Sequence, residues 1–136
     1  MTLDVTKPEV DTDQPVRKKV LIVEDNDLNM KLFNDLLVAH GYGTLQTRDG
    51  IEALALARQH HPDLILMDIQ LPIMDGYTAT RRIKADPALR SIPIIAVTSY
   101  ALDGEAKIAQ AAGCDDYVPK PYSPRELLAK IRQYLS

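Results

Sequence analysis

Three features that the sequence lacks narrow the kind of protein it can be. Cys114 is the only cysteine among 136 residues, so it cannot form an internal disulfide and gives no sign of an oxidising compartment. No apolar run reaches the roughly 18 residues that a membrane-spanning helix needs. The N-terminus lacks the basic and then apolar order of a signal peptide. We therefore expect a cytoplasmic protein with no membrane association.

The chain also lacks an excess of positive charge. Its formal net charge is −3, and residues 1–16 account for all of it, because they carry Lys7 against four acidic residues. Residues 17–136 hold equal numbers of acidic and basic side chains. A neutral domain without a basic stripe is poorly suited to bind a nucleic-acid backbone. We expect no direct DNA binding.

What is present suits one globular domain that follows a short tail. The apolar fraction of 46% and the charged fraction of 26% are ordinary for a soluble domain. A chain of 136 residues leaves little room for a second core. Residues 1–16 are acidic, contain two prolines and show no apolar period. We expect a flexible acidic tail over residues 1–16 and a folded domain over residues 17–136.

The folded part alternates between apolar runs and segments with helical spacing. The runs predict strands at residues 20–23, 42–47, 64–67, 94–97 and 116–118. The other segments predict helices at residues 27–40, 50–61, 77–85, 103–112 and 124–135. Strands that are apolar at every position indicate a parallel sheet covered on both faces. The predicted fold class is α/β, a doubly wound (βα)5 sandwich.

The apolar residues of the first predicted helix are expected to face the core. They are Met30, Leu32, Phe33, Leu36 and Leu37. A core role is the commoner fate of such residues in an amphipathic helix.

Polar side chains suited to phosphate chemistry follow four of the predicted strands. They are Glu24, Asp25, Asp68, Thr98 and Lys120. Ligands of open α/β sheets bind beyond the carboxyl ends of the strands, so we expect these side chains to meet there. Carboxylates that crowd together repel one another. Mg²⁺ resolves that conflict, since it binds a few carboxylates together with water and phosphate oxygens.

Asp68 is the predicted nucleophile of this site. With a cation shielding its charge, the carboxylate can attack a phosphoryl donor and form an acyl phosphate. The transferred group spreads charge over three equatorial oxygens, which need counter-charges and donors. Mg²⁺, the Lys120 ammonium and the Thr98 hydroxyl can each serve one of them.

These residues, in this order, resemble the signature of the response regulator receiver domain, a CheY-like fold. The resemblance covers about residues 18–135. It implies a flavodoxin-like sheet with strand order 2-1-3-4-5. It also implies a bacterial two-component switch and not a turnover enzyme, one that catalyses only its own phosphorylation and slow dephosphorylation. Within the family, residues 23–33 and 66–72 resemble stand-alone regulators of the DivK type.

The resemblance assigns a metal site to named residues. Mg²⁺, or Mn²⁺ in its place, would be held by Asp25, Asp68 and the backbone carbonyl of Gln70. Glu24 would reach the ion through water.

The resemblance also assigns switching roles. Thr98 would move toward the phosphoryl group, and the space that it leaves would let the Tyr117 ring turn inward. A cis peptide bond would precede Pro121. Gln70 and Tyr100 would flank the path of attacking water and so tune dephosphorylation.

The family's partners follow from the same resemblance. The phosphoryl donor would be a sensor histidine kinase or a four-helix histidine phosphotransfer protein that meets the first helix. Because the last predicted helix ends at Leu135, we expect no output domain, so the signal must pass to a downstream protein. The contact surface would lie on the fourth helix, fifth strand and fifth helix. Homodimer formation through this surface stays open.

Three other functions fit the sequence less well. A haloacid-dehalogenase-type phosphohydrolase expects a second acid two positions after its nucleophile, where this chain has Gln70. A flavodoxin-like flavin carrier needs a Ser/Thr/Gly-rich phosphate loop after the first strand, where residues 24–27 carry three acids. A pseudo-receiver that is never phosphorylated is disfavoured by the complete set of acids, threonine and lysine.

Overall fold

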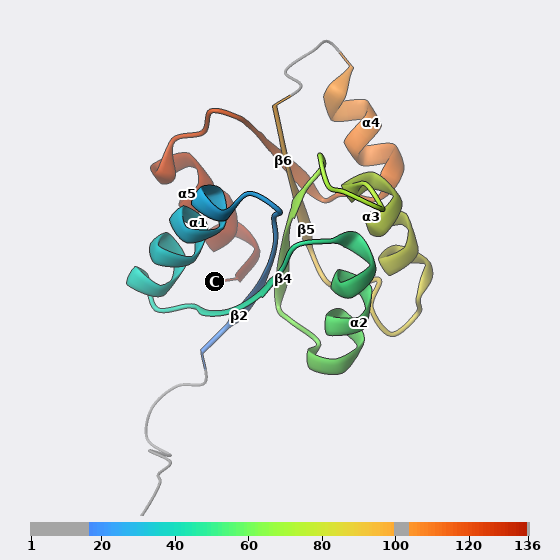
Figure 1. The fold of residues 1–136 in the computed structure, drawn as a ribbon, viewed down its shortest axis with the longest axis horizontal. Coiled ribbons are helices and arrows are strands. Elements are labelled where there is room, and N and C mark those ends of the chain that lie inside the picture. Colours follow the sequence, from blue (N-terminus) through green and yellow to red (C-terminus); the bar gives the residue numbers. More distant parts are fainter. Residues whose placement is uncertain (1–16, 100–103, 136) are drawn as a thin grey trace, which may run out of the picture.

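The computed structural model describes residues 17–99 and 104–135 (Figure 1). The sheet strands are β2 (Lys19–Val23), β3 (Gly43–Thr47), β4 (Leu64–Asp68), β5 (Ile94–Thr98) and β6 (Asp116–Pro119). The helices are α1 (Asp27–Ala39), α2 (Gly50–His60), α3 (Gly76–Ala85), α4 (Glu105–Ala112) and α5 (Pro124–Leu135). All strand pairs are parallel, in the order β3-β2-β4-β5-β6. In chain order this is 2-1-3-4-5, so the predicted fold is confirmed. The predicted tail over residues 1–16 lies outside the described residues.

The sheet separates two apolar cores. Helices α1 and α5 cover one face, and α2, α3 and α4 cover the other (Figure 1). Every residue of β4 and β5 is buried, as is β2 after its first residue. Alternate residues of each strand feed opposite cores, which explains why these strands are continuously apolar in sequence.

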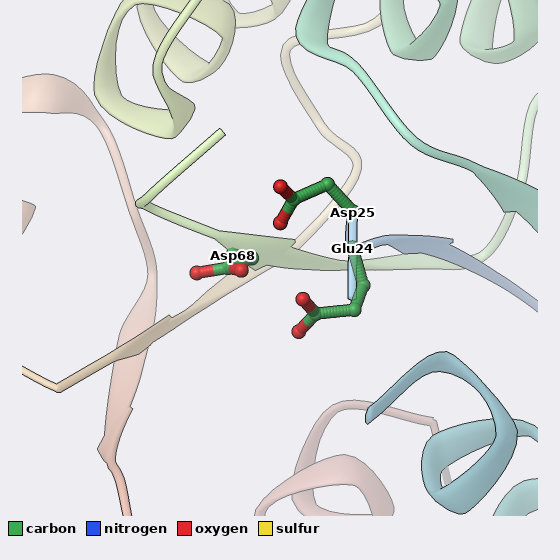
Figure 2. A group of neighbouring side chains, drawn as sticks. All are labelled: Glu24, Asp25 and Asp68. Atoms are coloured by element: carbon green, nitrogen blue, oxygen red, sulfur yellow. The ribbon is translucent and has the colours of Figure 1, made fainter. Parts of the chain in front are cut away.

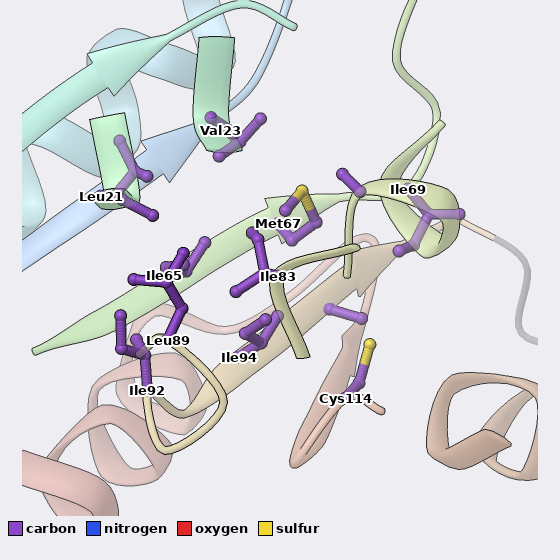
Figure 3. Close-up of a cluster of buried hydrophobic side chains, with 14 of the residues drawn as sticks. Leu21, Val23, Ile65, Met67, Ile69, Ile83, Leu89, Ile92, Ile94 and Cys114 are labelled. Atoms are coloured by element: carbon purple, nitrogen blue, oxygen red, sulfur yellow. The ribbon is translucent and has the colours of Figure 1, made fainter. Parts of the chain in front are cut away.

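The core beneath α2, α3 and α4 is the one drawn in Figure 3. Its fully buried aliphatic side chains come from the strands, from α3 and from the segment after α3: Leu21, Ile65, Met67, Ile83, Leu89 and Ile94. Burial of each such side chain contributes about 1.5–3 kcal/mol relative to exposure. These side chains hold the strand ends in a fixed relative position.

The prediction for α1 was wrong at one position. The helix buries Met30, Phe33 and Leu37, whereas Leu32 is 50% exposed. Leu36 packs partly against the core. Leu28 and Leu32, four residues apart, form a second apolar stripe that faces solvent. The packing of Phe33 and Leu37 against the sheet sets the rotation of the helix, and this rotation turns Leu32 outward.

Short polar side chains begin the helices that follow β2 and β4. Asn26 precedes α1 and accepts a hydrogen bond from the Asn29 N–H at 2.9 Å. Asp75 precedes α3 and accepts one from the Thr78 N–H at 3.0 Å. Such caps satisfy otherwise unpaired helix N–H groups, and here they fix the loops that leave the strand ends.

Candidate functional site

Three carboxylates meet at the carboxyl ends of β2 and β4. Glu24, Asp25 and Asp68 each offer an oxygen within 4.8 Å of the others. Figure 2 shows the three side chains gathered at the ends of the two strands. The pairing of Val23 with Met67 brings the next residues of the two strands side by side. Glu24 is 1% exposed and Asp68 is 3% exposed, whereas Asp25 is open to solvent. The cluster is therefore reached from one side.

The electrostatics of this cluster are set by crowding. Burial, and then the neighbouring Asp68, raise the pKa of Glu24 to about 7, although the Asn26 N–H and Lys120 act in the opposite direction. One Glu24 oxygen accepts from the Asn26 N–H at 3.1 Å. The other, Oε1, has no hydrogen-bond partner within the described residues. Clustered carboxylates with an unsatisfied buried oxygen fit a divalent cation that prefers oxygen ligands.

Lys120 supplies the positive charge of the site. Its Nζ lies 3.4 Å from Asp68 Oδ1 and 3.6 Å from Glu24 Oε1. Its backbone N–H donates to the carbonyl of Thr98 at 2.7 Å, which ties the segment after β6 to the end of β5. The peptide bond between Lys120 and Pro121 is cis. The ammonium is therefore held beside the Asp68 carboxylate.

Thr98 and Gln70 complete the surroundings of Asp68. Thr98 is the last residue of β5 and is fully buried, one position beyond the residue that pairs with Asp68. The Gln70 N–H donates to Asp68 Oδ1 at 3.0 Å. The Gln70 side chain accepts a hydrogen bond from the Ser99 hydroxyl, so it bridges the loops after β4 and β5.

The remaining predicted residues lie farther along the fold. Tyr117 is on β6, half-buried, and packs against the core beneath α2, α3 and α4. Tyr100 lies outside the described residues. The other predicted site residues meet at one edge of the sheet.

Sequence reasoning missed Gly76. A Cβ at this position would lie 2.3 Å from the Asp68 carbonyl oxygen and 2.8 Å from Ile69 Cα. The Gly76 N–H also donates to the Ile69 carbonyl at 3.0 Å. The start of α3 therefore packs directly on the backbone of Asp68, and only glycine fits there. The Asp75–Gly76 pair was visible in sequence, but its long-range contact was not.

The comparison with protein families decides which family the chain belongs to. Residues 20–132 match the response regulator receiver domain. The chain belongs to this family. Receiver domains are phosphoacceptor switches of two-component signalling.

Curated relatives narrow the resemblance. The polar-differentiation response regulator DivK of Brucella ovis is 54% identical over 118 residues, which cover 87% of this chain and 96% of the relative. DivK of Brucella anthropi is 53% identical over the same extent. This receiver domain is thus DivK-like in sequence over nearly the whole length of those proteins.

Solved structures agree with the fold. The receiver domain of the sensor histidine kinase PA1611 from Pseudomonas aeruginosa, with a magnesium ion in its active site cleft, is 38% identical with a TM-score of 0.82. The match covers 88% of this chain and 98% of that one. Chemotaxis regulator CheY4 of Vibrio cholerae is 26% identical, with a TM-score of 0.82 and coverage of 88% and 99%. In the described part of this chain, no helix is long and apolar enough to span a bilayer.

Proposed function

We propose that this receiver domain accepts a phosphoryl group on Asp68 from a phosphohistidine protein and signals through a phosphorylation-dependent protein contact. The observation that carries the proposal is the placement of Asp68. Its carboxylate is 3% exposed, shares its site with two other carboxylates and lies 3.4 Å from the Lys120 ammonium. A buried nucleophile with a fixed cation beside it suits phosphoryl transfer.

The acid cluster would bind Mg²⁺, and Mn²⁺ could take its place. Asp25, Asp68 and the Gln70 carbonyl would be ligands, and Glu24 would act through water. A bound cation would neutralise developing charge on the transferred group. The unsatisfied Glu24 Oε1 and the pKa of Glu24, raised by burial and by the neighbouring Asp68, support this assignment, because a cation would favour the charged form of this buried carboxylate.

Each residue of the site would have its own role in phosphoryl transfer from a phosphohistidine to Asp68. An Asp68 oxygen forms a bond to phosphorus while the bond between phosphorus and the donor imidazole nitrogen breaks. The freed imidazole keeps the electron pair and takes a proton from solvent. Lys120 turns its ammonium from the carboxylate to a phosphoryl oxygen, and the Thr98 hydroxyl donates to another. The Gln70 N–H, already on Asp68, keeps the carboxylate oriented.

The same residues would begin the switch. Thr98 is buried at the end of β5, so its movement toward the phosphoryl group alters the start of the connection to α4. Tyr117 on the neighbouring strand would then turn inward. Gln70 and Tyr100 would set the lifetime of the acyl phosphate. The downstream protein would read the resulting surface of α4, β6 and α5, and self-association would use the same surface.

A groove beside the site suits the phosphohistidine partner. Its volume is about 600 Å³, and it is lined by α1 and the segment after β6: Asn29, Leu32, Asp35, Leu36, Lys120, Pro121, Tyr122 and Pro124. Lys120 therefore belongs both to this groove and to the acid cluster. The exposed Leu28 and Leu32 add apolar surface on α1. A partner helix laid in this groove would bring a phosphohistidine near Asp68.

Incubation with Mg²⁺ and acetyl phosphate tests the proposal. The wild type is expected to gain an acid-stable, hydroxylamine-labile phosphate, and Asp68→Asn is expected to gain none. Asp63→Asn is the matched control, since Asp63 is an exposed acid that accepts from the Lys19 N–H, at the opposite end of β4 from Asp68. It should label like the wild type. Undiminished labelling of Asp68→Asn would contradict the assignment of Asp68 as the phosphoryl acceptor.

A further inference from the structure

Helix α4 is attached to the domain by very little apolar surface. Its buried residues are Glu105, Ala109 and Ala112. Its largest aliphatic side chain, Ile108, is 52% exposed. Since apolar stabilisation scales with the area removed from water, two alanine methyl groups hold a helix weakly. A directional polar contact therefore has more influence on the position of α4 than it would have on a well-packed helix.

Such a contact joins α4 to α3. The Tyr77 hydroxyl, in the first turn of α3, donates a hydrogen bond to Glu105 Oε2, in the first turn of α4. Glu105 is 6% exposed, so its carboxylate is largely removed from water. Burial and the facing Glu105 carboxylate raise the pKa of Tyr77, so the phenol remains a hydrogen-bond donor throughout the physiological range. A buried carboxylate that loses its donor is costly, so the contact is directional and strong.

Tyr77 is in turn fixed to the phosphorylation site. It follows Gly76, whose N–H donates to the Ile69 carbonyl and where a Cβ would meet the Asp68 carbonyl. Asp75 caps the same turn through the Thr78 N–H. Glu105 begins the helix that follows β5, which ends at Thr98. The hydrogen bond therefore connects an element fixed to Asp68 with the element that follows Thr98.

We propose that the hydrogen bond between Tyr77 and Glu105 is a tether that holds α4 in its unphosphorylated position. The proposal rests on the proposed function of Asp68. Tyr77 and Glu105 are positioning residues, since neither touches the reacting atoms. Movement of α4 on phosphorylation stretches or breaks the tether, so the tether stabilises the resting state. Removing it raises the population of the phosphorylated arrangement before any phosphate is bound, so more molecules are ready to react at Asp68.

The first test is the rate of phosphorylation by acetyl phosphate in Mg²⁺. Tyr77→Phe and Glu105→Ala each remove the bond and are expected to react about fivefold faster than the wild type. Glu105→Gln keeps an acceptor and is expected to lie nearer the wild type. The double variant should react no faster than either single variant, because both remove the same contact. Tyr134→Phe is the control and should react at the wild-type rate, because it removes a different tyrosine hydrogen bond, to the Asp115 carbonyl.

The second test needs no phosphorylation. Amide hydrogen exchange in α4 should quicken in Tyr77→Phe and in Glu105→Ala, while exchange in α5 stays as in the wild type. Unchanged exchange in α4 would overturn the tether. A wild-type rate of labelling in both variants would also overturn the tether. A contact with a merely structural role would alter stability and leave the labelling rate unchanged. If the wild type itself takes no phosphate, the proposed function fails, and the tether fails with it.

Discussion

Helices α4 and α5 both flank the last strand of the sheet, yet they are anchored by different means. Helix α5 buries Leu127, Leu128 and Ile131. Helix α4 buries two alanines and the carboxylate of Glu105. The first arrangement resists displacement, because every movement exposes large apolar side chains. The second leaves α4 dependent on one polar contact, as suits the proposed response of this helix to phosphorylation.

The residues of the site, by contrast, belong to buried strands or are hydrogen-bonded to them. Asp68 and Thr98 end strands that are buried along their whole length. Lys120 is held to Thr98 through its backbone. On the α5 side, the rings of Phe33 and Tyr122 stack with centroids 5.2 Å apart. Of the two helices, α4 is therefore the one that the proposed phosphorylation can displace at the lower loss of buried apolar surface.

The largest expected effect is the loss of the α4 response in Lys120→Ala. Without the ammonium, Asp68 can still take phosphate from acetyl phosphate, but the phosphoryl group loses its contact with the segment after β6, which a backbone hydrogen bond joins to Thr98. Acetyl phosphate should shift the amide NMR signals of α4 in the wild type and leave them in place in this variant. Lys130→Ala, which removes an ion pair with Asp116, is the control. A full α4 response in Lys120→Ala would show that Lys120 does not link the phosphoryl group to α4.

The next effect separates the anchors of the two helices. Ile131→Ala in α5 should lower the free energy of unfolding by about 2–5 kcal/mol, because it opens a cavity in a closed core. Ile108→Ala in α4 should change it by less than about 0.5 kcal/mol, because that side chain is half exposed. Chemical denaturation of both variants measures the difference. Equal losses of unfolding free energy in the two variants would contradict the difference in anchoring between α4 and α5.

A smaller effect is expected at the fixed end of α3. In Gly76→Ala the new methyl group meets the Asp68 carbonyl, so stability should fall by about 1–3 kcal/mol. Labelling by acetyl phosphate should slow as well, because the Asp68 backbone shifts. The matched control is Gly43→Ala, where the nearest atom would lie at an ordinary 3.5 Å. If the two variants are equally stable and equally reactive, α3 is not fixed to Asp68 in the way described.

The smallest effect is expected from the aromatic stack on the α5 side. Tyr122→Leu keeps apolar bulk but removes the ring contact with Phe33, and should cost about 0.5–1.5 kcal/mol. The response of α4 to acetyl phosphate should be unchanged, because the stack lies on the opposite face of the sheet. Loss of the α4 response in Tyr122→Leu would show that the two faces of the sheet are coupled. That result would contradict the separate anchoring of α4 and α5.

Much of the fold could be predicted because β2, β4 and β5 are buried on both faces and therefore read as continuous apolar runs. The site followed from one geometric rule, that polar residues after parallel strands share an edge. The orientation of α1 could not be predicted, since Leu32 and Phe33 belong to neighbouring apolar stripes and only packing selects one. The contact between Tyr77 and Glu105 joins two helices that are distant in sequence, so no local pattern announces it.

The central claim is that Asp68 itself carries the phosphoryl group. Borohydride reduction after treatment with acetyl phosphate and Mg²⁺ tests it directly, because it converts an aspartyl phosphate to homoserine, which peptide mass spectrometry can locate. We predict homoserine at position 68 and at no other acidic residue. Homoserine at position 25, or the one-carbon-longer alcohol of glutamate at position 24, would contradict the account. So would the absence of any reduced residue in a protein that retains label.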